Sequence, residues 1–507
     1  MASSAFKTYA QEYGGRVIVL FLLFLLALYQ FYNSGFGAFA AVCFIPAFIL
    51  IIVLSFRYRM FLFWTLIVYN YFVQFGEMPH PPLPMSLPNE LLEILLLIIA
   101  LIDVKKTFWE RTGNIMLFSL ILWCSFCTLE VLNDTCGLGI NIGAWYTGAR
   151  MLAFQLLYVH LVFTIYISNQ KELINYLYVW GALAFFAVLY VWKQQYIGFT
   201  PNEHNWLYNG PGGRTHLLQA GTLIRYWSVY SDAANFGIGM ASTGVAFIIF
   251  GITAKIKKYR YIFLAIGIAC IWAMFPSGTR TAIACLLAGF MAYIFLSKSF
   301  KIAIPFTIAF IFFAFILVFT NIGDGNQQIR RMRSAFNRKD ASANTRTMNQ
   351  QVMKKYLKDA PWGIGVGMGM DNVPANNKYS LMSYIAPDSE YVFIWIHTGV
   401  IGITTFLIVT AIMLLGACWI VFFTLKSSSL RGIGAGFCCA FVSQQLGAYG
   451  NQILLQFPNA LVFYGGLSIV YVLPWIEKEW IEWESKELAI QEEKKRLKLE
   501  KKRASRV

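Results

Sequence analysis

Long apolar stretches, separated by short polar or basic segments, recur along almost the whole chain. A helix needs about 20 apolar residues to cross the hydrocarbon core of a bilayer, and a soluble domain has no means of burying so many such runs. Only 13% of the residues are charged, against roughly a quarter in soluble domains. We therefore predict an all-α, polytopic transmembrane bundle of about 14 spans. The runs lie near 16–33, 36–56, 60–76, 88–104, 115–132, 150–168, 173–192, 236–254, 261–276, 281–297, 302–320, 395–424, 432–449 and 457–475.

Basic residues follow every second run, and this alternation predicts which side of the membrane each loop occupies. Lys and Arg concentrate in cytoplasmic loops, so the pattern places both termini in the cytoplasm. We expect a cytoplasmic N-terminus at 1–15, a transmembrane domain at 16–475 and a basic cytoplasmic tail at 476–507. The formal charge of +16 is explained in this way, and nucleic acid is not an expected partner. The basic boundaries carry Arg57 and Arg59; Lys105, Lys106 and Arg111; Lys171; Lys255, Lys257, Lys258 and Arg260; Lys298 and Lys301; and Lys426 and Arg431.

Two of the predicted external loops are long, at 193–235 and 321–394, and they carry most of the polar chemistry. From Asn321 to Glu390 the second loop holds ten basic and six acidic residues, a balance of +4. One interpretation is ordinary solubility. The other is an anionic ligand, and beside a membrane the obvious anion is the phosphate or diphosphate of a lipid head group.

Two arginines sit at predicted external boundaries. Arg280 lies in the tight turn Pro276-Ser277-Gly278-Thr279-Arg280, and Arg225 lies in an aromatic segment just before a span. Either arginine could anchor a helix end at the membrane interface. Anchoring arginines favour the cytoplasmic side, however, so a functional role is the preferred interpretation for Arg280.

The remaining polar features predict no metal and no cofactor. The histidines outside the late segment show no metal-ligand spacing, and most of the nine cysteines fall within apolar runs, where a small hydrophobic role is typical. The alternating glycines of Pro361–Gly369 favour a backbone turn packed closely against the membrane domain over a phosphate-binding loop. Glu93 and Glu130 are expected to be satisfied by neighbouring helices rather than to relay protons.

Several short segments, in order, resemble the O-antigen ligase and polymerase family of polytopic glycosyltransferases. The resemblance covers roughly 220–425, including the placement of a large external loop before the closing spans, and it implies a GT-C-like helical fold. The segments are Arg225–Asn235, Ser277–Arg280, Asn344–Asn349, Asp359–Gly367, Asp388–Tyr391 and His397–Gly402.

The resemblance implies roles for individual residues. Arg280 and Arg346 would bind the diphosphate of the donor, and Arg225 would assist or orient it. In ligases of the family a loop histidine before the next span is the proposed base, and Asp388 occupies that place here. Glu390 is a further carboxylate candidate, although a solvated loop acid is the preferred interpretation. His397 is a further substrate-binding candidate, with a helix-packing histidine as the preferred alternative.

The function implied is transfer of a glycan from a polyprenyl diphosphate to an acceptor hydroxyl, such as that of lipid A core. Transfer would occur at the periplasmic face of the bacterial inner membrane, without a metal, and membrane lipids would surround the enzyme. Polymerisation of an O-antigen or exopolysaccharide, or O-glycosylation of a protein, would use the same motifs. A transporter or flippase of an anionic substrate, or a scaffold of an envelope assembly, would explain the external arginines differently.

Overall fold

The computed structural model describes residues 57–76, 86–103, 109–209, 217–219, 223–298, 341–369, 372–384 and 388–504, with short stretches between 18 and 53 and between 304 and 330. The chain divides into two units, Met1–Thr65 and Leu66–Val507. The second unit contains nearly all of the described structure. The predicted spans at 16–33, 36–56 and 302–320 lie largely outside the described residues.

The first part of the described chain is a succession of helices. The only strands among the described residues are β1 and β2, which pair antiparallel with Leu218 opposite Ile224. In order, the elements are α2 (Arg59–Phe72), α3 (Ser86–Ile102), η2 (Trp109–Arg111), α4 (Ile115–Leu129), η3 (Glu130–Leu132), α5 (Ile142–Ala149), η4 (Arg150–Phe154), α6 (Gln155–Tyr166), α7 (Gln170–Tyr196), α8 (Pro201–Tyr208), β1 (Leu218–Gln219), β2 (Leu223–Ile224) and α9 (Ala233–Thr253).

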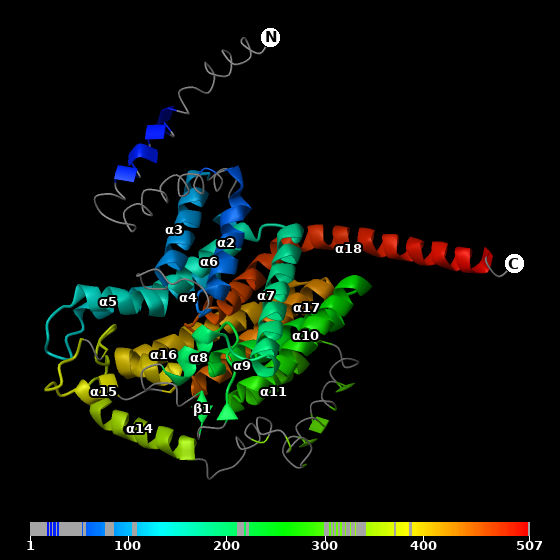
Figure 1. Cartoon of the computed structure of the whole chain (residues 1–507). Coiled ribbons are helices and arrows are strands. Elements are labelled where there is room, and N and C mark those ends of the chain that lie inside the picture. The colour runs from blue at the N-terminus through cyan, green and yellow to red at the C-terminus, as the bar shows by residue number, and fades with distance from the viewer. Residues whose placement is uncertain are drawn as a thin grey trace. The chain divides into compact units, whose positions relative to one another are not determined.

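The second part is also helical (Figure 1). Its elements are α10 (Lys257–Met274), η5 (Phe275–Ser277), α11 (Arg280–Leu296), α14 (Ala341–Leu357), α15 (Ser380–Tyr384), α16 (Glu390–Trp419), η7 (Ile420–Thr424), α17 (Ser428–Gly450), η8 (Ala460–Tyr464) and α18 (Gly465–Ala504).

Seven helical segments of the described chain are long and apolar enough to cross a membrane. The all-helical membrane fold is therefore confirmed, whereas the count of about 14 spans is not. One further apolar helix, Arg280–Leu296, is shorter. The seven segments are Ile115–Leu132, Ile142–Tyr166, Gln170–Tyr196, Ala233–Thr253, Lys257–Ser277, Glu390–Thr424 and Ala460–Leu497.

Short polar residues set where several helices begin. Asp232 accepts hydrogen bonds from the backbone N–H groups of Ala234 and Asn235 at 2.6 and 3.0 Å, and it thereby starts α9. Asn114 and Asn169 cap α4 and α7 in the same way. These side chains satisfy N–H groups that have no partner within the helix.

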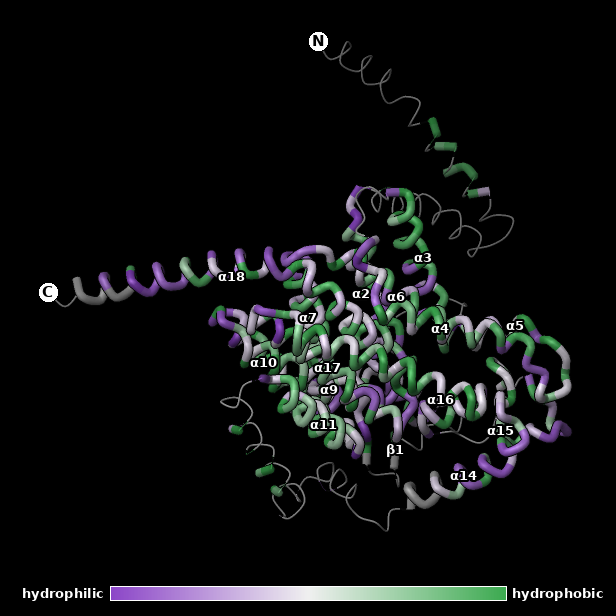
Figure 2. The backbone as a smooth tube through the Cα atoms, turned by 180° about the vertical axis from the view of Figure 1, so that it is seen from behind, coloured by the Kyte–Doolittle hydropathy of each residue, from purple (hydrophilic) through white to green (hydrophobic). Residues whose placement is uncertain are grey.

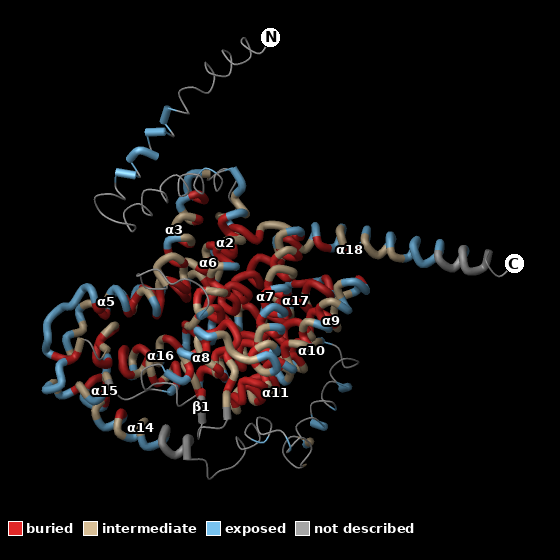
Figure 3. The backbone as a smooth tube through the Cα atoms, viewed as in Figure 1, coloured by how far each residue is buried: buried red, intermediate tan, exposed pale blue. Residues whose placement is uncertain are grey.

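The centre of the bundle is formed by α9, which packs on α10, α11 and α17 and is buried along most of its length (Figure 3). Small residues allow α9 and α10 to approach each other closely. A Cβ atom at Gly244 would lie only 2.7 Å from Cγ1 of Ile271. Large aromatic rings fill the remaining space beside it, with Trp180 stacked on Phe437 at 5.8 Å. Because protein interiors are close-packed, this arrangement provides a rigid frame for the loops at its ends.

The described part of the predicted large loop has a small core of its own. Met353, Leu357 and Ile364 are buried together with Val392 and Ile396 from α16. Gln351, Lys354 and Lys355 are exposed on α14, which is partly hydrophilic in Figure 2. This amphipathic packing fixes α14 against the beginning of α16.

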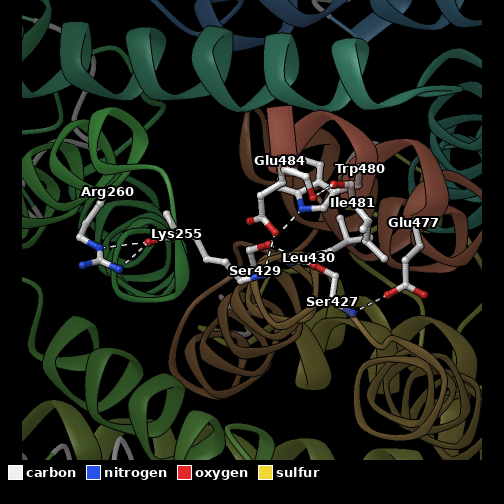
Figure 4. A network of polar contacts seen from close by, with 11 residues as sticks. Lys255, Arg260, Ser427, Ser429, Leu430, Glu477, Trp480, Ile481 and Glu484 are labelled. Atoms are coloured by element: carbon white, nitrogen blue, oxygen red, sulfur yellow. Dashed lines mark hydrogen bonds and ion pairs between the residues drawn. The ribbon is translucent and has the colours of Figure 1, made fainter. Parts of the chain in front are cut away.

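Polar contacts fasten α18 to the opposite end of the bundle (Figure 4). Lys255 forms an ion pair with Glu484 at 2.8 Å, and Trp480 donates to the Ser429 hydroxyl at 3.0 Å. Glu477 accepts from the backbone N–H of Ser427 at 2.7 Å. The helix passes without a break through residue 476, where the cytoplasmic tail was predicted to begin, and its far end is hydrophilic. The sidedness of the loops and termini stays a prediction.

Candidate functional site

Arg225 is buried, and it braces the turn that precedes α11. Its Nε donates to the backbone oxygen of Ser277, and its Nη2 donates to the hydroxyl of Thr279, both at 3.0 Å. The Thr279 hydroxyl in turn donates to the backbone oxygen of Ala233 at the start of α9, at 2.8 Å. The guanidinium therefore joins three segments, and at least part of its donor capacity is used within the protein.

Arg280 is half-buried at the first position of α11. Gly278 makes this position possible, because its φ of 56° lies in the left-handed region that glycine adopts easily. The next residue, Thr281, accepts a hydrogen bond from Asn451 at 3.2 Å. This contact places the start of α11 beside the end of α17.

Asp388 is exposed and directly precedes α16. Its φ of 49° is left-handed, a conformation that aspartate tolerates better than most residues but that is uncommon, and such strain clusters at functional sites. The next side chain, Ser389, donates to the backbone oxygen of Ala448 at 3.1 Å. The structure thus brings Asp388 and Arg280 to the same end of α17.

Glu390 is not a solvated loop acid, and that expectation is wrong. Its side chain is buried, and Oε2 accepts from the backbone N–H of Leu454 at 3.0 Å, within a group of N–H donors that includes Ile453 and Leu455. These backbone N–H groups satisfy the hydrogen-bonding capacity of the buried carboxyl group. Glu390 therefore holds the segment between α17 and η8.

A groove lies along α16 beside Asp388, and we call it the outer groove. Its volume is about 630 Å³. Lys354 of α14 and Lys358, which follows the end of α14, stand on one wall. Half-buried Trp395 and Ile403 and exposed Val400 form an apolar surface along α16. The other lining residues are Gln350, Leu357, Pro361, Ser389, Tyr391, Val392 and Tyr449.

Arg346 belongs to α14, two helical turns before Lys354. Its backbone is described, but its side chain lies outside the described residues. Positions 346, 350, 354 and 358 recur every four residues, so they share one face of the helical segment. Gln350, Lys354 and Lys358 all line the outer groove.

A second cavity, the inner cavity, lies on the other side of α16 and has a volume of about 380 Å³. Phe393 and His397 face it, whereas Ser389, Tyr391 and Trp395 face the outer groove. The other lining residues are Gln74, Ser86, Glu90, Thr147, Gly148, Arg150, Met151, Leu152, Gln155, Gly367, Gly369, Leu455, Gln456 and Phe457.

His397 is buried, and its Nδ1 lies 3.1 Å from the backbone oxygen of Gly365. The backbone N–H of Gly365 donates to the backbone oxygen of His397 at 3.1 Å. The glycine segment thus pairs with α16 where Gly399, at φ 66°, interrupts the helix. A Cβ at Gly367 would collide with the backbone oxygen of Ala144, so the predicted close-packed turn is confirmed.

Two ionisable groups in the predicted external loops have shifted pKa values. Burial raises the pKa of the Cys136 thiol to about 11, and the Asp134 charge adds to the shift. Burial also acts to raise the pKa of Glu203, but hydrogen bonds from Thr200, Gln194 and Lys193 outweigh it and hold the pKa below its usual range. Glu203 thereby closes a capping box with Thr200 at the start of α8.

The two buried acids near span ends have protein partners. Asn89 donates to Glu93 at 2.8 Å, and Asn133 donates to Glu130 at 2.8 Å. Among the residues that the structure describes, no cluster of three or more His, Cys, Asp or Glu side chains is arranged to hold a metal. The predicted independence of metal remains a prediction.

Sequence reasoning missed Lys354 and Lys358 as individual groove residues, and it missed Glu90, Arg150 and Gln155 altogether. The lysines were counted only in the loop's charge balance. Arg150 and Glu90 stood at the edges of predicted spans, where the positive-inside pattern gives no reason to pair residues 60 positions apart. The sequence did show an acidic and a basic residue at span edges, and this was the one signal that could have suggested the ion pair.

Residues 265–407 match the family model described as O-antigen ligase. The matched segment runs from α10 to α16 and includes Arg280, Asp388 and the glycine turn. No curated protein matches the chain. Within this helical membrane protein, residues 265–407 are therefore similar to O-antigen ligases, and the match confirms the resemblance predicted from the sequence.

Proposed function

We propose that this protein transfers a glycan from a polyprenyl diphosphate to an acceptor hydroxyl at the external face of the bacterial inner membrane. The observation that carries the proposal is the outer groove, where cationic side chains meet an apolar wall beside Asp388. The family match supports this class of reaction. Lipid A core is the proposed acceptor, which makes the enzyme a ligase.

The two walls of the groove suit the two parts of the donor. The ammonium groups of Lys354 and Lys358 attract phosphate oxygens, and charge-assisted hydrogen bonds to phosphate are among the stronger polar contacts. Trp395, Val400 and Ile403 belong to a predicted membrane span and offer an apolar surface for the prenyl chain. A polyprenyl diphosphate combines just these two chemistries.

The proposed reaction is a single displacement at the anomeric carbon. The acceptor oxygen forms a bond to that carbon, while the bond from carbon to the diphosphate oxygen breaks and its electron pair leaves with the diphosphate. The acceptor proton passes to the carboxylate of Asp388, which later releases it to water. One displacement inverts the configuration at the carbon.

The cations stabilise negative charge as it grows on the leaving group. In this proposal Arg280, at the turn that Arg225 braces, takes this role together with Arg346, whose position shares a helical face with the groove lysines. A guanidinium can hold two phosphate oxygens at once, which fixes their orientation. In this proposal the side chains supply the positive charge, so transfer should persist in a metal chelator.

The first test is glycan transfer from a lipid-linked donor in membranes that lack the native enzyme. At matched expression, we expect Arg280→Ala and Asp388→Asn to lose most activity. Lys355→Gln is a suitable control because Lys355 is exposed on α14 but does not line the groove. A single addition to lipid A core would support a ligase, and a ladder of products would assign a polymerase instead.

Full activity in both Arg280→Ala and Asp388→Asn would refute the proposed site. A transporter would show a different result, because substrate movement across the membrane would require Arg280 but no acceptor glycan. Transfer by the purified protein, in a system with no second compartment, would exclude transport as its only activity.

A further inference from the structure

We infer that the inner cavity binds sugar residues, and that Glu90, Arg150 and Gln155 recognise their hydroxyl groups. This inference rests on the proposed function and extends it to a saccharide site separate from the diphosphate. The three residues lie outside the segment that matches the ligase family model. They would therefore set specificity with side chains that this chain supplies from its N-terminal half.

The polar lining of the cavity matches the chemistry of hydroxyl groups. Gln74, Gln155 and Gln456 line the cavity with amides, each of which has both donor and acceptor groups. A sugar hydroxyl is likewise a donor and an acceptor. Gln456 is already oriented, because its Oε1 accepts from the Ser231 hydroxyl at 2.7 Å.

The charges of the cavity are balanced within it. Arg150 lies 3.2 Å from Glu90 and also donates to the Ser86 hydroxyl at 3.0 Å. A guanidinium has five N–H donors and a carboxylate about four acceptor sites, so both groups retain capacity for a ligand. A paired site of this kind suits a neutral polyol, whereas a diphosphate is better matched by the lysines of the outer groove.

The size and the apolar lining of the cavity fit the same ligand. Its volume of about 380 Å³ lies within the roughly 300–1,000 Å³ typical of small-molecule sites. Phe393 and Phe457 provide apolar ring surface on which the C–H groups of a sugar can pack. The cavity thus has the size and the lining of a site for a small saccharide.

The cavity is also located where a glycan is needed. It shares α16 with the outer groove, and Asp388 lies at the beginning of that helix. A glycan held on one side of α16 and a diphosphate held on the other would meet near Asp388. Binding energy from sugars remote from the reacting carbon would position that carbon for attack.

Protection of an introduced cysteine tests this inference without relying on activity. Thr147 lines the cavity and is exposed, so Thr147→Cys should react with a small hydrophilic maleimide. The probes are the oligosaccharide released from the lipid-linked donor by mild acid and the deacylated core oligosaccharide of the acceptor. Asn209→Cys is the control, because Asn209 is exposed and lies outside the cavity.

We expect one of the two probes to slow alkylation of Thr147→Cys in a saturable manner and to leave Asn209→Cys unaffected. The effective probe identifies the bound saccharide as that of the donor or that of the acceptor. In the Thr147→Cys background, Gln155→Leu removes amide chemistry at similar size, and we expect it to weaken protection about tenfold, as loss of about one hydrogen bond would. Glu90→Gln should weaken it similarly.

Absence of protection by both probes would overturn the inference. Unchanged protection in both Gln155→Leu and Glu90→Gln would also overturn the roles assigned to them. These outcomes are separable from failure of the proposed function. Glycan transfer without protection would support the transferase and refute the saccharide site. Protection without transfer would support the saccharide site and refute the transferase.

Discussion

Replacement of Arg225 distinguishes a residue that braces a turn from one that binds the donor. Arg225→Ala removes the donors to Ser277 and Thr279, both at 3.0 Å. Hydrogen bonds that involve a charged group contribute about 1.5–3 kcal/mol each, so the two together stabilise the turn by about 3–6 kcal/mol. Arg225→Lys keeps the charge and one donor, and it should lose about half of that.

Amide hydrogen exchange measures this effect directly. The turn amides of Gly278 and Ala282 bond to the backbone oxygens of Phe275 and Thr279 at 2.9 and 3.2 Å. A loss of about 3 kcal/mol raises the opening equilibrium roughly 100-fold, so exchange over 275–282 should accelerate strongly in Arg225→Ala. We expect glycan transfer to fall with it, and Arg225→Lys to lie between.

The result that would refute this reasoning is loss of transfer in Arg225→Ala with unchanged exchange over 275–282. Arg225 would then act by direct contact with the substrate, as the family resemblance implies. Exchange in α17 serves as the internal control, because a general loss of folding would accelerate it as well.

Three further predictions concern the groove, the loop and the effect of pH. The double substitution of Lys354→Gln and Lys358→Gln should raise the KM for the donor about 5- to 30-fold, because exposed ion pairs contribute up to about 1 kcal/mol each. Kinetics at low salt would measure this change, because salt screens such contacts. An unchanged KM would contradict the groove assignment. Glu390→Ala leaves buried N–H donors without a partner, at a cost of about 1–3 kcal/mol each. The variant should therefore unfold at a lower temperature than Glu390→Gln, which keeps an acceptor. Equal unfolding temperatures in the two variants would contradict the anchoring role of Glu390. The pKa of Glu203 is lowered, so this carboxylate stabilises the fold above the usual carboxyl range near pH 4, and the stabilisation disappears as pH falls through the lowered pKa. Glu203→Gln should remove this acid dependence of unfolding. An acid dependence that persists in Glu203→Gln would contradict the prediction.

The membrane fold was predictable because it depends on local composition. Apolar runs predicted α4, α7, α9, α10 and α11 within about four residues of their ends, whereas α5 and α8 lie in predicted loops. The alternating glycines predicted the close turn around Gly367. The tail predicted from residue 476 onward continues α18 as one helix, and its cytoplasmic location stays a prediction. A change from apolar to charged residues marks a change of solvent, and it does not mark the end of a helix.

The candidate site was predictable only in part, for a physical reason. Motif order pointed to Arg280 and Asp388, which the structure brings to one end of α17 through the neighbouring residues Thr281 and Ser389. The burial of Glu390 depends on backbone N–H groups some 60 residues away, and no local pattern encodes that contact. The same is true of the Glu90–Arg150 pair in the inner cavity.

The most direct test of the central claim is to map where the donor lipid binds. A polyprenyl diphosphate that carries a photoreactive group next to the diphosphate would be activated in the presence of the purified protein, and the labelled peptides would be identified by mass spectrometry. The account predicts labelling within 350–358 and 388–403, the walls of the outer groove, and loss of that labelling in Lys354→Gln with Lys358→Gln. Labelling confined to other segments, such as the pocket around Arg431 at the far end of α17, would contradict it.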